Sequence, residues 1–354
     1  MNQTRGVSWV RFGNFLMAAA ITPVVLTASP TTMNAAAVSN ESAQHAELTV
    51  EGVVSKALQN NLDLEIMRVD LDKEEANWMS ARADAGKIKF ETVTSLDQAN
   101  KKYETVAKAE KDKELKRFSV REQENKLKLE ARAAFYEALY LQKDVELKQS
   151  QAGKKQTEEG LKALAEARGN LQKALQKLHE VMGEGEGEIR GWRLIEDRTG
   201  KPYELPPLED VIEKGYRQRT EILKKQAELK WAEVKVNLVY QYSSLLTYKG
   251  QVARSEARKA ELDLLKLKAA AKKDMTLKYN TLKAAIENRT QRNEGLKRAE
   301  ESYQAAMEQD KEGIVTPLER EQAEEAWFKA KADELAADRE YKLALAAFEY
   351  SVGE

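Results

Sequence analysis

Apolar residues recur along much of the chain at steps of three, four and seven, the spacing of the buried face of a coiled-coil helix. One regular run lies near the C-terminus and consists of Ala323, Trp327, Ala330, Ala337, Tyr341, Ala344 and Phe348. Alanine fills much of this seam, so neighbouring helices can approach closely. The pattern predicts long helices, packed either as a plain antiparallel bundle or dimeric coiled coil, or as a curved wall in which each helix has two neighbours.

The sequence also repeats itself over a long interval. A shift of 158 positions superimposes similar residues: Val53 on Val211, Val54 on Ile212, Lys56 on Lys214, Asp63 on Glu221, Leu64 on Ile222 and Leu71 on Leu229. A shift of 170 aligns residues 173–183 with 343–353, and a shift of 143 aligns Tyr136 with Tyr279. The first half is therefore about 27 residues shorter between these landmarks, the difference between the two shifts. So long a repeat indicates a duplicated helical hairpin rather than a solenoid unit.

Helix-start signals stand at the opening of both halves. Thr49 is a suitable N-cap with Glu51 in the first turn, and Pro207 precedes Glu209 and Asp210 in the same arrangement. We therefore predict two homologous halves, residues 38–182 and 208–354, joined by a linker at 183–207.

The first 37 residues have the pattern of a signal peptide. Arg5 and Arg11 precede an apolar run at residues 12–26, and small residues end at Ala35, Ala36 and Ala37. We expect cleavage near Ala37, giving an exported protein that begins near Val38. An uncleaved membrane anchor is the alternative, although Thr22 and Pro23 shorten the apolar run.

Glycine and glutamate alternate at the start of the linker, from Gly183 to Glu188. A cation site needs six or more oxygen ligands held in place, and this alternation does not specify them. We interpret the segment as a solvated linker rather than a metal site.

Composition excludes several functions. The net charge is −1, so no overall field attracts nucleic acid, and the absence of cysteine excludes disulfides and a lipidated cysteine. After residue 38 no segment is apolar enough to span a bilayer as a helix. The two histidines, His45 and His179, have no ligand partners at metal spacing, and no Gly-rich phosphate loop is present. We expect no enzyme activity and no cofactor.

Three stretches resemble the TolC-type outer-membrane efflux family. Residues 48–64 are similar to the opening of each family half, with 215–222 as the second copy, and residues 341–353 resemble the close of each repeat. Between them Gly313, Thr316, Glu319 and Ala323 have the spacing of the family's Gly-x-x-Ser/Thr-x-x-Asp/Glu turn. The resemblance implies a homotrimer that forms a helical tunnel below an outer-membrane β-barrel. It also implies export through a membrane-fusion adaptor and an inner-membrane transporter.

The chain departs from the family where the barrel strands belong. Roughly ten residues are available at each place, between Gly86 and Leu96 and between Tyr240 and Tyr248, whereas a membrane strand pair needs more than about twenty. We therefore predict an all-α, TolC-like helical domain without a full β-barrel, whose helices turn over near Gly86 and Ser243. Direct membrane insertion is doubtful, and Tyr240, Tyr242 and Tyr248 are interpreted as packing at a helix turn rather than as a membrane-interface cluster.

The candidate functional site is the turn of the second hairpin. Gly313 suits a C′ position with positive φ, Thr316 can cap the next helix, and Pro317 and Glu319 fit its first turn. Any well-made helical hairpin has these features. In the family this tip meets the adaptor, so the predicted partner-binding residues are Gly313, Ile314, Val315, Thr316, Pro317, Leu318 and Glu319.

Two function classes remain. One is a trimeric conduit of an efflux or secretion system, located in the outer membrane and periplasm by resemblance. The other is an exported coiled-coil structural or interaction protein of the cell envelope, which kept the fold without the pore. In an organism without an outer membrane, the second would be extracytoplasmic or associated with the cell wall.

Overall fold

The computed structural model describes residues 47–154, 157–184, 192–196 and 203–354, which all belong to one compact unit, His45–Glu354. The predicted signal peptide, residues 1–37, lies outside the described residues, as does His45.

Each half opens with two helices that are separated by a single residue. Asn61 separates α1 (Val50–Asn60) from α2 (Leu62–Lys87), and Arg219 separates α6 (Leu208–Gln218) from α7 (Thr220–Tyr242). Thr49 accepts a hydrogen bond from the Gly52 amide, as predicted for an N-cap. A shift of 158 positions carries the bounds of α1 onto those of α6 and the start of α2 onto that of α7.

A long helical hairpin follows in each half. In the first half a 3₁₀ turn (Phe90–Thr92), α3 (Leu96–Ala99) and a π-helical turn (Asn100–Glu104) lead into α4 (Thr105–Lys154), which pairs with α5 (Glu158–Val181). In the second half α8 (Tyr248–Lys311) pairs with α9 (Pro317–Val352). The prediction of an all-α fold with long antiparallel helical hairpins is confirmed.

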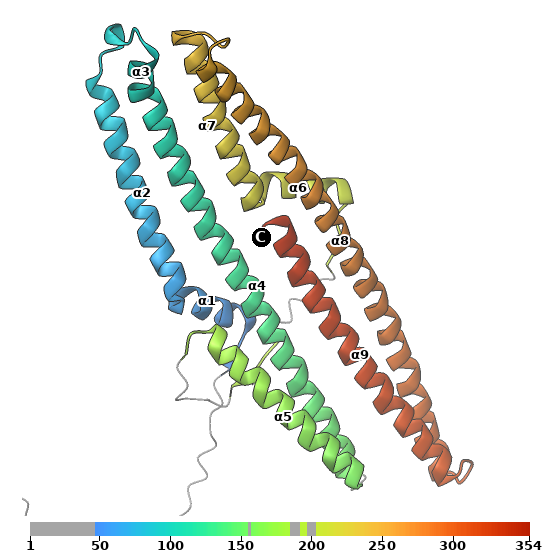
Figure 1. The fold of residues 1–354 in the computed structure, drawn as a ribbon. Helices are drawn as coiled ribbons and strands as arrows, with labels where there is room; N and C mark the ends of the chain where they lie inside the picture. Colours follow the sequence, from blue (N-terminus) through green and yellow to red (C-terminus); the bar gives the residue numbers. More distant parts are fainter. Residues whose placement is uncertain (1–46, 155–156, 185–191, 197–202) are drawn as a thin grey trace, which may run out of the picture. The chain divides into compact units, whose positions relative to one another are not determined.

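The helices lie side by side in a row, with consecutive neighbours running in opposite directions (Figure 1). In one part of the unit the order is α2, α4, α7, α8, and in the other it is α5, α4, α9, α8. Helix α4 therefore joins the first half to α7 and α9 of the second half, and α2 and α8 are the outermost helices of the order α2, α4, α7, α8.

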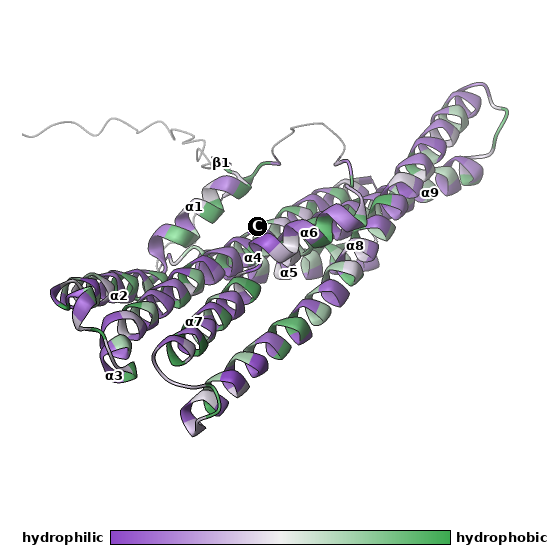
Figure 2. Ribbon diagram, turned by 90° about the horizontal axis from the view of Figure 1, so that it is seen from above, coloured by the Kyte–Doolittle hydropathy of each residue, from purple (hydrophilic) through white to green (hydrophobic). Residues whose placement is uncertain are grey.

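The core is a series of small apolar clusters along the row. Phe135, Leu139 and Leu178 belong to the cluster between α1, α4 and α5, and Leu282 and Phe348 to the one between α8 and α9. Figure 2 shows apolar and polar residues alternating along each long helix, as expected where only one stripe of the helix is buried.

The two halves close on their opening helices in the same way. Gly183, which follows α5, has φ +66° and lies against Asn60, while Gly353, which ends α9, has φ +95° and lies against Gln218. Just beyond each glycine a glutamate pairs with a lysine of the opening helix, Glu184 with Lys56 at 2.5 Å and Glu354 with Lys214.

The described linker residues 192–196 lie after the Gly183–Glu188 segment and are partly buried. Two short strands pair in parallel: β1 (Glu47–Leu48) at the start of the first half and β2 (Arg193–Leu194) in the linker. Leu48 and Leu194 are both buried in the first-half core, because this pairing places their side chains over α1 and α4.

Glu196 fixes the end of this linker segment. Its carboxylate pairs with Lys143 of α4 at 2.7 Å and with Lys342 of α9 at 2.9 Å. Burial acts to raise the pKa of Glu196, but the hydrogen bonds from Lys143 and Lys342 outweigh burial and lower that pKa. The segment therefore links both halves electrostatically.

Short turns join the opening helices to the hairpins, as predicted. Residues 88–95 connect α2 to α3 and residues 243–247 connect α7 to α8, and neither described segment contains a strand. Helix α2 continues through Gly86 to Lys87, so the turn begins slightly later than expected. Within the described part of the chain, the helices hold no stretch long and apolar enough to cross a membrane.

Candidate functional site

The turn between α8 and α9 begins with a well-formed helix end. The Gly313 amide donates to the Asp310 carbonyl at 3.1 Å, and the Ile314 amide donates to the Gln309 carbonyl at 2.9 Å. This pair of bonds is the Schellman arrangement, and Gly313 has the φ of +70° that it requires. In this arrangement the residue at the Ile314 position usually packs on the residue at the Gln309 position. Here that partner is polar, so Ile314 has no apolar neighbour of this kind.

Helix α9 begins with a complete capping box. The Thr316 hydroxyl accepts a hydrogen bond from the Glu319 amide at 3.3 Å, and the Glu319 carboxylate accepts from the Thr316 amide at 2.8 Å. The Thr316 hydroxyl also donates to this carboxylate at 2.9 Å, and the hydrogen bonds that the carboxylate accepts from the Thr316 amide and hydroxyl lower the pKa of Glu319. Pro317 occupies the first helical turn, where its missing N–H has no consequence.

Two large apolar side chains are exposed on this turn. Ile314 is 67% exposed and Leu318 is 62% exposed, while Val315 is half-buried. The Asp310–Arg320 ion pair at 2.7 Å spans the base of the turn. The predicted site residues thus lie together, in a turn whose backbone hydrogen bonds fix the direction of the exposed apolar pair.

An aromatic layer separates the tip from the rest of the hairpin. The rings of Tyr303 and Trp327 stack at 5.4 Å, and Lys154, the last residue of α4, pairs with Glu324 beside them. Helix α8 continues from Tyr303 to its end at Lys311, which adds about 12 Å of helix at roughly 1.5 Å per residue. The second hairpin therefore extends past the level of Lys154, at which α4 ends.

A second surface of interest was not identified from the sequence. The outermost helices α2 and α8 carry large apolar side chains that are exposed: Leu62, Ile66, Val69 and Met79 on α2, and Val252, Leu262, Leu265 and Leu277 on α8. The steps of four and three from Leu62 to Val69 are those of a coiled-coil seam. This spacing was the available signal, but the sequence alone does not show that the seam is left uncovered.

A buried polar group between the halves was also missed. The Tyr140 hydroxyl of α4 donates to the Asp338 carboxylate of α9, and Arg289 of α8 pairs with the same carboxylate at 2.5 Å. Burial, and then the bond to Asp338, raise the pKa of Tyr140. Burial and the neighbouring Asp338 raise the pKa of Glu334. Asp338 lies beside the seam residue Ala337, but no sequence pattern relates it to Tyr140.

His179 lies where the first half closes on its opening helix. His179 is buried in the last turn of α5, with Nδ1 3.2 Å from the Glu184 carboxylate. Among the described residues, no group of three or more acidic, histidine or cysteine side chains is placed to hold a metal ion.

No family-wide sequence profile and no curated protein matches this chain. Solved structures do match its fold. A membrane protein from Pseudomonas aeruginosa matches with a TM-score of 0.62 and 12% identity, over 90% of this chain and 99% of that one. The open MtrE outer membrane channel of Neisseria gonorrhoeae matches with a TM-score of 0.65 and 12% identity, over 86% of this chain and 88% of that one.

The CmeC outer membrane channel of Campylobacter jejuni matches with a TM-score of 0.58 and 12% identity, over 92% of this chain and 94% of that one. At these identities the likeness is one of fold, and it extends over both halves. The two helical hairpins and their opening helices have the fold of the TolC-type outer-membrane channels.

Proposed function

We propose that this chain is a component of a TolC-like efflux or secretion channel: a helical conduit of three copies that works with a membrane-fusion adaptor and an inner-membrane transporter. The observation that carries the proposal is the row of helices whose outer members, α2 and α8, each expose an apolar stripe. No bond is made or broken in this role. The chain supplies a wall and a docking point.

The direction of the helices favours closure into a ring. Neighbours in the row alternate in direction, and α2 and α8 run oppositely, so α8 of one copy can lie antiparallel beside α2 of the next. Ile66 and Val69 would then pack against residues such as Leu262 and Leu265. Helices satisfy their backbone hydrogen bonds internally, so a closed wall of them can enclose water through which a solute passes.

The mass of the protein in solution tests this assembly. We expect light scattering to give three times the 40.0 kDa chain, less any cleaved signal peptide, and the double variant Ile66→Asp with Leu262→Asp to give a single chain. Each buried apolar side chain of this size contributes about 1.5–3 kcal/mol, and a charge in its place adds a desolvation cost. The measurement is made with and without detergent.

A matched control comes from the tip. Leu318 is 62% exposed and Ile66 is 61% exposed, so Leu318→Asp changes the same kind of surface away from the outer helices. It should remain trimeric. A wild-type protein that is monomeric under both conditions contradicts the conduit, as does a double variant that stays trimeric.

We further propose that the tip of the second hairpin contacts the adaptor. Ile314, Val315 and Leu318 form an apolar surface on a turn whose backbone hydrogen bonds are complete. Such a surface suits the apolar face of a partner's helical hairpin. The second hairpin extends beyond the aromatic layer at Trp327, whereas the first hairpin is shorter. The tip is therefore accessible to a partner.

The double variant Ile314→Asp with Val315→Asp tests the contact. We expect it to lose capture of the adaptor in a pull-down while helix content, melting temperature and trimer mass stay close to wild type. The matched control is Leu161→Asp on α5, which is also exposed but belongs to the first hairpin. Capture that survives, or a fold that collapses, contradicts tip docking.

The short turns at residues 88–95 and 243–247 favour a second candidate function. With no strand in either segment, the chain suits an exported coiled-coil spacer or interaction protein of the cell envelope. The two functions differ in transport. Dye accumulation in cells that lack the protein distinguishes them, because only loss of a conduit raises it.

A further inference from the structure

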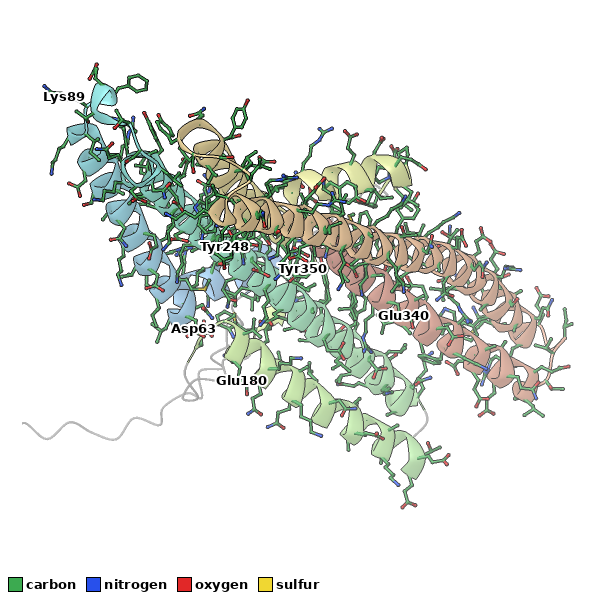
Figure 3. The ribbon with its side chains drawn as sticks, turned by 45° about the horizontal axis from the view of Figure 1, so that its top comes forward. Asp63, Lys89, Glu180, Tyr248, Glu340 and Tyr350 are labelled. Carbon is green, nitrogen blue, oxygen red and sulfur yellow. The ribbon has the colours of Figure 1, made fainter. Side chains whose placement is uncertain are left out.

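The turns at residues 88–95 and 243–247 form one end of the unit. Lys249 Nζ lies 3.6 Å from the Asp97 carboxylate, and both turns share a small core that includes Val93, Leu96 and Leu238. Figure 3 labels Lys89 in the turn after α2 and Tyr248 at the start of α8. The 64-residue helix α8 runs from here to the turn that contains Ile314 and Leu318. This end and that turn therefore lie at opposite ends of one helix.

Large apolar side chains at this end remain outside the shared core. Leu246 and Tyr248 are each 82% exposed, the highest values among large apolar residues of the described chain, and Phe90 is 68% exposed. Tyr240 is also exposed, so the interpretation of Tyr240 and Tyr248 as packing at a helix turn is wrong, whereas Tyr242 does pack against the shared core. Phe90 and Leu246 stand on turns and Tyr248 on the first residue of α8, whereas the stripes of α2 and α8 lie along helix flanks. These side chains do not form a continuous apolar stripe against which a helix of a second copy could pack.

Positive charge accompanies these side chains. Residues 240–254 contain two basic residues, Lys249 and Arg254, and no acidic residue. Residues 86–101 contain three lysines, of which Lys89 stands in the turn, against two acidic residues. Both segments are net basic in a chain whose net charge is −1. Lys87 pairs with Asp84 and Lys249 with Asp97, so the positive charge offered to a negatively charged surface comes mainly from Lys89, Lys101 and Arg254.

We infer that this end docks on an anionic phospholipid surface, with Phe90, Leu246 and Tyr248 entering the headgroup region. Tyrosine and other amphipathic rings favour the membrane interface, and lysines beside them gain energy from anionic headgroups. The contact is peripheral and uses side chains of the turns. It goes beyond the proposed conduit and does not depend on trimer formation.

Because the chain contains no cysteine, one introduced cysteine gives a single labelling site. Leu246→Cys in the full chain is coupled to an environment-sensitive fluorophore and mixed with vesicles of phosphatidylcholine and phosphatidylglycerol. The matched control is Leu161→Cys, an exposed leucine on α5 that belongs to neither stripe and lies well away from this end. We expect a blue shift and increased intensity at position 246 and little change at 161. The label reports only its own surroundings, so an apolar N-terminal segment does not affect the comparison.

Two further variants separate the apolar and charged contributions. In the Leu246→Cys background, Phe90→Ser with Tyr248→Ser should weaken binding about tenfold on every vesicle. Lys89→Gln with Lys249→Gln should weaken it about tenfold on anionic vesicles, and should have little effect on pure phosphatidylcholine. Circular dichroism confirms that each variant is folded.

Three outcomes overturn the inference. The first is no change at position 246 with anionic vesicles, and the second is an equal change at positions 246 and 161. The third is a change at 246 that appears without lipid as the protein concentration rises, which would show that a second copy covers this end.

Discussion

The closing contacts of the two halves are nearly the same, whereas their outer ends differ. Glu184 and Glu354 follow a positive-φ glycine and pair with Lys56 and Lys214, which are related by the shift of 158. In contrast α5 has 24 residues and α9 has 36.

This difference shows where the fold is constrained. At a closure the backbone of one helix end lies against the break between two others, so a change in length or side chain disturbs several elements. A hairpin tip contacts little of the rest of the unit, so its length can change without moving the row. One tip can therefore be shortened while the other retains an exposed apolar turn.

The largest expected effect is at the closing glycines. A Cβ on Gly183 would lie 2.8 Å from the Asn60 Cβ, and one on Gly353 would lie 2.9 Å from the Gln218 carbonyl carbon. Positive φ adds strain for any other residue. We expect Gly183→Ala and Gly353→Ala each to lower the free energy of unfolding by about 2–4 kcal/mol in urea titrations.

Two other glycines serve as controls for this comparison. Gly313→Ala meets the same positive φ but open space, and should cost only about 1 kcal/mol. Gly295→Ala, within α8 and also in open space, should be stabilising by about 0.5–1 kcal/mol. If one closing glycine tolerates alanine as well as Gly313 does, the two closures are not equivalent.

The next effect concerns the contact between the halves. Tyr140→Phe removes the hydroxyl that donates to the buried Asp338 and should lower the free energy of unfolding by about 1–3 kcal/mol. Tyr303→Phe, which removes a less buried bond to Glu324, should cost under about 1 kcal/mol. Equal losses of unfolding free energy in urea titrations would show that the bond from Tyr140 to Asp338 stabilises the fold no more than the less buried bond from Tyr303 to Glu324.

Much of this arrangement follows from the sequence. The shift of 158 predicted the matching opening helices, and Gly313, Thr316 and Pro317 predicted the turn at α9, because caps and turns depend on neighbouring residues. The pairing of β1 with β2 and the bond from Tyr140 to Asp338 join residues far apart in the chain. The exposed stripes of α2 and α8 were also missed, because periodicity shows that a helix has an apolar face but not whether a neighbour covers it.

A smaller effect should appear as a dependence on pH. Burial and the neighbouring Asp338 raise the pKa of Glu334, so the folded state holds this proton more tightly than the unfolded state. Stability from this group is present below the ordinary pKa of 4.5 and is lost as the pH rises through the raised value. We expect Glu334→Gln to remove part of this loss and to stabilise the protein at pH 7 by under about 1 kcal/mol.

Thermal unfolding measured from about pH 4 to about pH 8 tests the Glu334 prediction. The melting temperatures of the variant and the wild type should converge at the acid end, where both side chains are neutral. Glu340→Gln, at an exposed position of the same helix, provides the control and should follow the wild type. A variant that is less stable than wild type at pH 7 would show that the Glu334 carboxylate is stabilised by its surroundings.

The smallest expected difference is between the two closing ion pairs. Lys56 contacts Glu184 and also lies 4.5 Å from the centre of the Trp192 ring, whereas Lys214 pairs with Glu354 at a more exposed position. Exposed pairs contribute little, and a cation over an aromatic ring adds to the pair. We expect Lys56→Met to cost about 1 kcal/mol and Lys214→Met under about 0.5 kcal/mol in urea titrations at low salt. High salt should reduce both losses, and the Lys214 loss proportionally more, because its pair is more accessible to ions. Equal losses would mean that the contact between Lys56 and the Trp192 ring contributes nothing.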